Sequence, residues 1–326
     1  MKKRPEIIPV ASGKGGVGKS FLTANLGFAL GEMGHRTVAV DMDLGGSNLH
    51  AFLGLSNRFP GIGDFLKART AELEEMLVPT EASNLRFLSG DGMTPFMANI
   101  PHAQKIRLIS RLVKLPAEYI LLDLGAGTSF NTLDFFRLSR HGIVITTPEY
   151  PAIMSMLSFL KHFLLRVIEG NFTTHYRIRE ILRLLYKQPM NGQQAIMKKV
   201  FSEIAAADAE AGKIVKEVFQ NYRPRVVFNM GSHPDEVNIA VKIDAGMKDI
   251  LSIEADCFGF VFEDPSVRES IRKRIAFFPN YRAGMVSESI ARIAERIVKF
   301  WDRPVRNSAH HVLSHTRELY LSYGSA

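Results

Sequence analysis

The sequence of 326 residues has few features that would cross-link it or anchor it in a membrane. It contains one cysteine, Cys257, which excludes a disulfide framework and any metal site built on paired thiolates. No apolar run looks long enough to span a bilayer, and the basic start MKKRPEIIPVAS has a short apolar part interrupted by Pro5 and Pro9. The sequence therefore predicts neither a membrane-spanning segment nor a cleaved signal peptide, and we expect a cytoplasmic protein.

Acidic residues are fewer than basic ones. The chain has 33 Asp and Glu against 41 Lys and Arg, which gives a formal net charge of +8 and a pI near 9.5. A basic surface attracts nucleic acid, anionic membranes or acidic partners. A well-solvated surface with a mild excess of cations has the same composition, because net charge does not locate a patch. Both interpretations stay open at this point.

A glycine-rich loop stands near the start, in the stretch SGKGGVGKS. Residues 13–20 match the pattern G-x-x-x-x-G-K-[ST], whose glycines let successive backbone N–H groups surround phosphate oxygens at the start of a helix. Lys19 supplies a positive charge for the β- and γ-phosphates, and the Ser20 hydroxyl is placed to bind Mg²⁺. The residues predicted to bind the nucleotide here are Gly13, Gly15, Gly16, Val17, Gly18, Lys19, Ser20 and Phe21.

Short apolar segments alternate with helical stretches along most of the chain. Strands are predicted at residues 6–11, 37–40, 85–88, 119–122, 143–145, 225–228 and 258–262. Strands that are apolar throughout and separated by helices are typical of a parallel sheet covered on both faces. We therefore predict an α/β fold with a doubly wound, mostly parallel sheet flanked by helices.

The crossover between the strands at residues 143–145 and 225–228 is much longer than a parallel connection needs. It contains several helical patterns, and Gln-Pro-Met-Asn-Gly at residues 188–192 divides it. We interpret it as a helical insertion at about residues 170–222 of one domain, residues 1–302, with residues 303–326 as a C-terminal tail. Extra helices packed on the sheet would give the same pattern.

Carboxylates follow the ends of several predicted strands, where doubly wound sheets bind ligands. Asp123 closes an apolar strand, as a Walker B carboxylate does when it holds magnesium through water. Asp43 follows the second strand and is suited to orient an attacking water, and Asp264, which follows the last strand, is expected to contact the nucleotide. One such aspartate is more often a helix cap or a turn residue. Several around one phosphate loop favour a nucleotide site with Mg²⁺ at Ser20, Asp43 and Asp123.

Four segments resemble the MinD/ParA family of ATPases. They are SGKGGVGKS at residues 12–20, similar to its deviant Walker A motif; VAVDMDLGGSN at 38–48, similar to switch I; LLDLGAG at 121–127, similar to switch II; and VVFNM at 226–230, similar to the strand whose asparagine contacts adenine. Together they run through about residues 5–300. The resemblance implies a P-loop ATPase that binds ATP and Mg²⁺ and hydrolyses ATP to ADP and phosphate.

The resemblance also assigns roles to single residues. It implies that Lys14 crosses a dimer interface to the phosphates of the partner's nucleotide, so that ATP holds a homodimer together until it is hydrolysed. Two triphosphates that face each other in a desolvated interface need such cations. Asp43 would position the water, Lys19 would bind phosphate, and Asn229 would contact the base. The alternative is a solvated Lys14 without a role in the partner's site.

The stretch DLGGSNL at residues 43–49 resembles the MinD branch and the FlhG/FleN flagellar-number regulators more than the partition ParA proteins. This implies a switch that positions or regulates a flagellum or the division site, with a protein partner that stimulates hydrolysis. The start lacks the glutamine-containing helix of FlhG, and the tail lacks an obvious membrane helix of the MinD type.

Two basic regions leave other surfaces open. The helical pattern at residues 290–301 carries interleaved cations and is expected to pack on the sheet as the last helix of the domain, with an anionic membrane as the alternative. A second cluster would bind DNA nonspecifically in a ParA-like partition or regulatory ATPase, or would be a solvated helix face. Its members are Arg268, Arg272, Lys273, Arg274 and Arg282.

Overall fold

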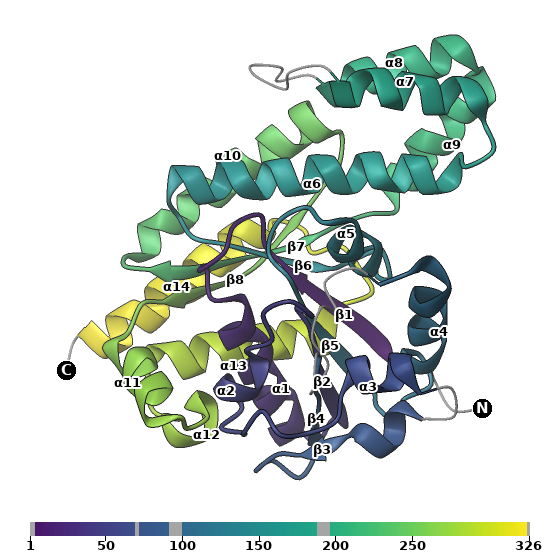
Figure 1. The fold of residues 1–326 in the computed structure, drawn as a ribbon. Helices are drawn as coiled ribbons and strands as arrows, with labels where there is room; N and C mark the ends of the chain where they lie inside the picture. The colour runs from purple at the N-terminus through teal and green to yellow at the C-terminus, as the bar shows by residue number, and fades with distance from the viewer. Residues whose placement is uncertain (1–3, 69–71, 91–99, 188–195, 325–326) are drawn as a thin grey trace.

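The computed structural model describes residues 4–68, 72–90, 100–187 and 196–324. At its centre lies one sheet in the order β3-β4-β2-β5-β1-β6-β7-β8, in which only the β3–β4 pair is antiparallel (Figure 1). The strands are β1 (Glu6–Ala11), β2 (Thr37–Met42), β3 (Val78–Pro79), β4 (Leu85–Leu88), β5 (Tyr119–Leu124), β6 (Ile143–Thr146), β7 (Arg225–Gly231) and β8 (Asp256–Phe262). The predicted doubly wound, mostly parallel sheet is confirmed.

Helices cover both faces of the sheet. They are α1 (Lys19–Glu32), α2 (Leu49–Phe52), α3 (Ile62–Lys67), α4 (His102–Leu112), α5 (Phe130–Phe136), α6 (Tyr150–Asn171), α7 (Tyr176–Lys187), α8 (Ile196–Ala207), α9 (Ala209–Gln220), α10 (Asn238–Gly246), α11 (Pro265–Lys273), α12 (Phe277–Asn280), α13 (Met285–Phe300) and α14 (Ser308–Gly324). Short 3₁₀ turns lie at Leu73–Met76 and Pro234–Val237, and a π turn lies at Met247–Leu251.

The side chains of each strand alternate between two apolar cores, as the two-residue period of a strand requires. On one face Ile8, Ala39 and Leu121 pack with α1, α12 and α13. On the other face Val38 and Ile120 pack with α4, α5, α6 and α10. Because both faces are buried, every strand except the short β3 is a nearly continuous apolar run.

Helix α1 is buried around almost its whole circumference. It lies between the sheet and α13, so residues on both sides of the helix face apolar neighbours. Gly34, with φ +89°, follows the end of the helix, because glycine adopts this left-handed conformation without strain.

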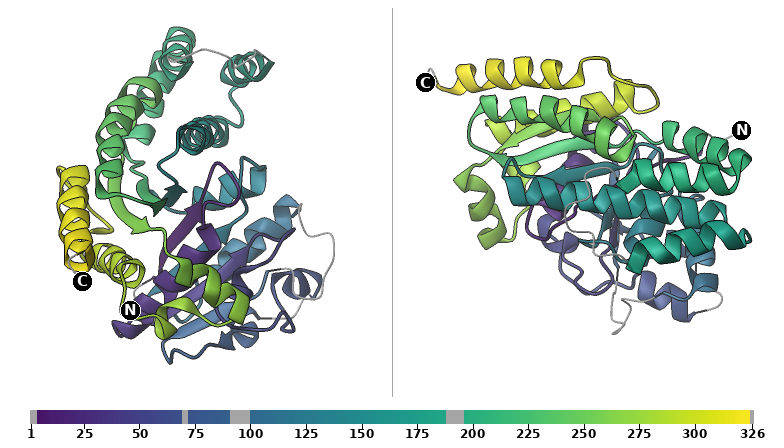
Figure 2. Two further views of the ribbon diagram at one scale, coloured as in Figure 1. Left: turned by 90° about the vertical axis from the view of Figure 1, so that its left-hand side faces the viewer. Right: turned by 90° about the horizontal axis from the view of Figure 1, so that it is seen from above.

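Helices α7, α8 and α9 lie beyond α6, on the side of α6 away from the sheet (Figures 1 and 2). They occupy the region predicted as a helical insertion, and its assignment to one domain of residues 1–302 stays a prediction. The predicted break at residues 188–192 lies outside the described residues. Helix α6 is long and apolar enough to cross a bilayer by length and composition, so the expectation that the chain has no such run was wrong. However, 56% of its apolar window is buried inside the protein, as in the core helix of a globular domain.

Helix α13 packs on the sheet, as expected for the amphipathic pattern at residues 290–301. Ile290, Ile293 and Ile297 are fully buried beside β8 and α1. The interleaved cations are held by the protein itself: Arg296 donates to the Phe258 carbonyl at 3.0 Å, and Lys299 pairs with its neighbour in the helix. The predicted tail contains α14, which packs along β8 and buries Val312 and Leu319.

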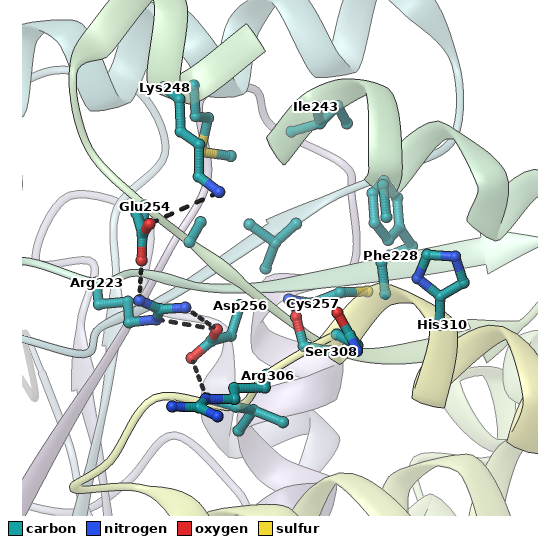
Figure 3. Close-up of a pocket in the computed structure, with 17 residues that line it drawn as sticks. Arg223, Phe228, Ile243, Lys248, Glu254, Asp256, Cys257, Arg306, Ser308 and His310 are labelled. Carbon is teal, nitrogen blue, oxygen red and sulfur yellow. Dashed lines mark hydrogen bonds and ion pairs between the residues drawn. The ribbon is translucent and has the colours of Figure 1, made fainter. Parts of the chain in front are cut away.

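Cys257 lies on β8 beside a cavity of about 400 Å³ between β7, β8, α10 and the start of α14 (Figure 3). Burial raises the pKa of the Cys257 thiol to about 12, so at pH 8 almost none of it is thiolate, the form that reacts with alkylating reagents. We expect iodoacetamide to alkylate the native protein on the order of 1,000-fold more slowly than the urea-unfolded chain at pH 8. Mass spectrometry of timed samples measures both rates, and equal rates would contradict the burial.

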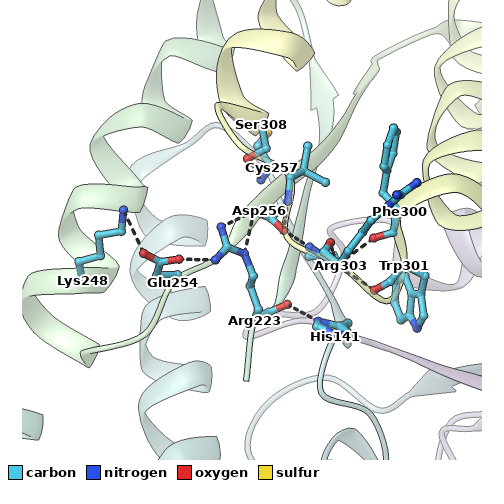
Figure 4. Close-up of polar contacts among 12 residues, drawn as sticks. His141, Arg223, Lys248, Glu254, Asp256, Cys257, Phe300, Trp301, Arg303 and Ser308 are labelled. Atoms are coloured by element: carbon cyan, nitrogen blue, oxygen red, sulfur yellow. Dashed lines mark hydrogen bonds and ion pairs between the residues drawn. The ribbon is translucent and has the colours of Figure 1, made fainter. Parts of the chain in front are cut away.

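A network of charged residues lies at the starts of β7 and β8. Arg223 donates to Asp256 at 2.9 Å and also pairs with Glu254, which in turn contacts Lys248 (Figure 4). Arg225 is fully buried and pairs with the same Asp256. The network ties the strand starts to the segment after α13, because the Val305 N–H also donates to Asp256 at 3.2 Å.

Candidate nucleotide site

A cavity of about 570 Å³ lies at the carboxyl ends of the parallel strands, where doubly wound sheets bind ligands. It brings together residues from the glycine loop, the ends of β2, β5, β7 and β8, and α11. Nine of the predicted site residues line it: Gly15, Gly16, Gly18, Lys19, Ser20, Phe21, Asp43, Asn229 and Asp264. Gly13, Lys14, Val17 and Asp123 do not line this cavity.

The glycine loop joins β1 to α1 with a backbone that needs glycine. Gly16 and Gly18 have φ +83° and +85°, and a Cβ at Gly18 would lie 2.1 Å from Asn229 Nδ2. Gly13 serves a different purpose, since a Cβ there would lie 2.0 Å from the Ser155 carbonyl oxygen of α6. Gly13 therefore allows the loop to pack against α6, and the sequence pattern alone could not distinguish that role from phosphate contact.

Lys19 and Asp123 form a buried ion pair under the loop. The Lys19 ammonium donates to Asp123 Oδ1 at 3.2 Å, and both side chains are less than a tenth exposed. Burial raises the pKa of Asp123 above its ordinary value, and Lys19 and Ser20 partly offset that rise. The second carboxylate oxygen, Oδ2, is buried without a hydrogen-bond partner, which is costly unless a ligand completes it.

Asp43 lies at the edge of the cavity beside the switch II segment. A Cβ at Gly125 would lie 3.3 Å from Asp43 Oδ1, so glycine at this position lets the carboxylate approach the loop after β5. Gly46 lies next to the same carboxylate, since a Cβ there would lie 3.7 Å from Oδ1. Asp43 therefore faces the space between its own loop and the loop after Asp123, as its predicted role in orienting water requires.

Asp41 organises that loop, although no role was predicted for it from the sequence. It is fully buried and accepts hydrogen bonds from Ser47 Oγ at 2.6 Å, Leu49 N at 3.0 Å and Asp43 N at 3.1 Å. Burial and repulsion by Asp123 raise the pKa of Asp41 to about 7. Its place two residues before Asp43 at a strand end was the signal available in the sequence.

The far end of the cavity has a polar and an apolar part. Asn229 is buried and donates to the Val17 carbonyl at 2.8 Å, so it also fixes the glycine loop. Asp264 caps α11 by accepting from Ser266 N at 2.8 Å. Both residues line the cavity, and their predicted contacts to the nucleotide stay predictions. An apolar wall, which was not predicted from the sequence, comes from Phe52, Met230, Phe262, Val267 and Ile271.

Lys14 lies outside the cavity, exposed at the tip of the glycine loop. Ser12 Oγ donates to its carbonyl at 2.9 Å, which fixes the backbone of the loop at this point. Among the described residues no carboxylate pairs with the Lys14 ammonium, so it is available to a ligand outside its own subunit. Its predicted role in the partner's site stays a prediction, as does the solvated alternative.

The residues around Ser20 fit a magnesium ion. Hard cations take oxygen ligands and Mg²⁺ keeps several waters and substrate oxygens, so a hydroxyl and one or two carboxylates are sufficient. Ser20 and Asp43 line the cavity, and Asp123 offers an oxygen that has no partner. Within the described ranges, no group of three or more His, Cys, Asp or Glu could hold a metal by itself.

A family model agrees with this site. The ParA model, described as an iron-transfer P-loop NTPase of the NUBPL type, matches residues 3–163, which include the glycine loop, Asp43 and Asp123. The model covers just under half of the chain, and it supports a place for the chain in the MinD/ParA family of P-loop NTPases. The lone Cys257 differs from what an iron carrier with paired cysteine ligands would need.

Curated MinD relatives match a little under half of the chain. The putative septum site-determining protein MinD of Oltmannsiellopsis viridis is 34% identical over 149 residues, which are 46% of this chain and 47% of the relative. The chain spans about half the length of the curated relatives it matches.

Solved MinD/ParA structures extend the likeness of fold to most of the chain. The MinD of Pyrococcus horikoshii complexed with Mg-ADP has a TM-score of 0.57 at 21% identity and covers 90% of this chain and 96% of its own. The MinC:MinD complex of Aquifex aeolicus has a TM-score of 0.59 at 21% identity and covers 93% and 99%. At this identity the comparison shows the P-loop NTPase fold.

Proposed function

We propose that this protein is an ATP-binding and ATP-hydrolysing dimerisation switch of the MinD/ParA type. Its ATP-bound dimer would position or regulate a cellular structure, namely the number or placement of flagella or the division site. The observation that carries the proposal is that Lys19 and Asp43 line one cavity, that Asp123 pairs with Lys19, and that Lys14 is exposed outside the cavity on the same glycine loop. Hydrolysis would then separate the subunits, so the protein acts as a slow switch.

Each residue has a task that its position supports. The amides of the glycine loop and the Lys19 ammonium would bind the phosphates, and Asn229 and the apolar wall would hold the base. Ser20, Asp43 and Asp123 would hold Mg²⁺, which neutralises phosphate charge when bound. Asp43 would orient the attacking water, and Lys14 of each subunit would reach the phosphates of the other.

The switch can be tested with a variant that binds ATP without hydrolysing it. We expect Asp43→Ala with ATP to elute as a dimer in size-exclusion chromatography with light scattering, because the water is no longer positioned and ATP stays bound. Wild type with ADP should be a monomer, and wild type with ATP should return to monomer as ATP is consumed. Phosphate release should fall by about 100-fold or more in the variant.

Lys14→Ala is the matched control for this experiment. The double variant Lys14→Ala/Asp43→Ala should bind ATP as a monomer, because only the cation from the opposite subunit is removed. A dimer of this double variant would contradict the role of Lys14, and a monomer of Asp43→Ala with bound ATP would contradict the switch itself.

The partner surface of the dimer belongs to the same proposal. We expect a cytoplasmic protein whose dimer is recruited to a partner that stimulates hydrolysis or to the inner face of the membrane. The alternative, a ParA-like partition or regulatory ATPase, needs a DNA-binding surface. The basic cluster suggested for it is partly neutralised, since Arg268, Lys273 and Arg282 form ion pairs with Glu263, Glu269 and Glu32. The first function therefore has more support.

A further inference from the structure

The positive charge of the chain is concentrated in one part of it. Residues 101–225 carry 18 Lys and Arg against 10 Asp and Glu, an excess equal to the net charge of +8, whereas the rest of the chain is balanced. This segment forms β5, β6 and helices α4 to α9, which occupy the upper and right-hand part of Figure 1. A surface with this excess attracts an acidic ligand.

A groove with a volume of about 470 Å³ lies within this basic part, between α4, the end of α5, the second half of α6 and the start of α7. We call it the α4–α7 groove. Its apolar lining comes from Ile106, Ile109 and Leu138, and Ile106 is 56% exposed. Its charged lining contains four cations, Lys105, Arg137, Arg166 and Arg179, and two anions, Asp134 and Glu169.

Two of the four cations are neutralised within the groove. Asp134 of α5 accepts from Lys105 of α4 at 2.5 Å and from Arg166 of α6 at 2.8 and 3.0 Å. Arg166 also pairs with Glu169 at 2.6 Å. These bonds fix the three helices relative to one another and leave Arg137 and Arg179 without a carboxylate among the described residues.

The two remaining guanidinium groups are positioned by backbone contacts. A Cβ at Gly170 would lie 1.9 Å from Arg137 Nη1, so this glycine leaves the space that the Arg137 side chain fills against α6. Arg179 donates one hydrogen bond to the Thr173 carbonyl at 3.3 Å and keeps its other donors. Arginine held in this way presents a planar set of donors that matches a carboxylate.

We propose that the α4–α7 groove binds an acidic, amphipathic segment of a partner protein. Its carboxylates would pair with Arg137 and Arg179, and its apolar side chains would cover Ile106, Ile109 and Leu138. Arginine beside exposed aliphatic side chains is typical of protein interfaces. A flat membrane does not enter a groove between helices, and the phosphates of nucleic acid gain nothing from the exposed isoleucine.

The occupant would touch the helix that follows switch II. Helix α5 begins at Phe130, three residues after Gly127, and Ser129 caps it by accepting from Thr132 N at 3.2 Å. Arg137 follows the last residue of this helix. A partner in the groove therefore contacts one end of α5 while the nucleotide cavity lies near the other.

Fluorescence anisotropy of a labelled probe peptide tests the groove without nucleotide. The probe is a helix-forming peptide of about 14 residues with leucines on one face and glutamates elsewhere. We expect wild type to bind it and Arg179→Glu to bind it about 10-fold or more weakly, since the variant exchanges attraction for repulsion. The charge-matched control Arg272→Glu, on exposed α11, should stay within about 2-fold of wild type.

Further variants separate the groove from nonspecific charge. Arg137→Gln and Ile106→Asp should each weaken binding, and a urea unfolding curve of each variant shows whether it remains folded. Equal binding by Arg179→Glu and Arg272→Glu, or no binding of the peptide by wild type, would overturn the proposal. The proposal would also be overturned if Arg179→Glu weakened binding only to phosphatidylglycerol vesicles, or only to random-sequence duplex DNA, and not to the peptide. If the wild-type protein bound the peptide in an Arg179-dependent way but did not hydrolyse ATP, only the proposed function would be rejected.

Discussion

Replacing Arg225 by alanine is expected to lower the free energy of unfolding by about 3–5 kcal/mol, because it leaves a buried network without its central cation. The side chain is fully buried and pairs with Asp256. It also donates to the carbonyl oxygens of Phe300, Trp301 and Arg303 at 3.1, 2.8 and 2.9 Å. Truncation therefore removes bonds to three acceptors that join β7 to the end of α13.

Burying the positive charge of Arg225 is unfavourable, and the lowered pKa of its guanidinium reflects this desolvation cost. Burial lowers the pKa of the guanidinium to about 10, still far above neutral pH, so the charge persists and must be paired. The rings of Phe258 and Trp301 lie over the guanidinium at 4.8 and 6.0 Å and stabilise the charge further. Asp256 keeps Arg223 as a partner in the variant, which limits the loss.

Urea unfolding followed by circular dichroism measures the effect of Arg225→Ala. The control is Arg272→Ala on exposed α11, which should change the free energy of unfolding by less than about 0.5 kcal/mol. A loss below about 1 kcal/mol for Arg225→Ala would show that the network contributes little. The double variant Arg225→Ala/Asp256→Ala should be less destabilised than the sum of the single variants, since neither partner is then left buried alone.

The second large effect concerns the nucleotide. Lys19→Ala should weaken ATP binding by about 2–5 kcal/mol, or roughly 30-fold or more in Kd, because it removes a buried cation from the phosphate site. Isothermal titration calorimetry in the presence of Mg²⁺ measures the change. Lys14→Ala is the matched control, since the Lys14 side chain is exposed and lies outside its own cavity, and its Kd as a monomer should stay within about 3-fold of wild type.

The stability of Lys19→Ala tells whether the variant still folds. Removing the ammonium leaves Asp123 without its main cation, and the pKa of Asp123, already raised by burial, should rise further. A group whose pKa is raised in the folded state contributes most at low pH and loses that contribution as pH rises through its folded pKa. The variant should therefore be closer to wild type in stability at pH 5 than at pH 8. Unchanged ATP affinity in a folded variant would contradict the site.

The strands were predictable because their signal is local. A buried parallel strand is apolar along its length, and the seven predicted strands lie where the structure has them, apart from one to three residues at their ends. The two-residue strand β3 was missed, because its pairing with β4 leaves no periodic pattern in so short a segment. The phosphate loop was predictable because its backbone needs glycine at fixed positions.

Contacts between distant segments could not be predicted from the sequence. The bond from Asn229 to Val17 joins residues 212 positions apart, and the close approach of Gly13 to Ser155 depends on how α6 lies across the sheet. The apolar wall of the cavity comes from four separate segments, and only one of its residues, Met230, lies in a motif noted in the sequence. The same is true of the α4–α7 groove, whose cations lie on four helices and look like ordinary surface charge in the sequence.

The ion pair between Lys19 and Asp123 has a consequence for selectivity. The ammonium is already engaged by an internal anion, so an incoming ligand would compete with that carboxylate for it. A chloride or a lone acetate carries one negative charge and would gain little from the exchange. Under the proposed function, a triphosphate would bring several negative charges and accept hydrogen bonds from the loop amides at the same time, so the site would favour it over the abundant small anions.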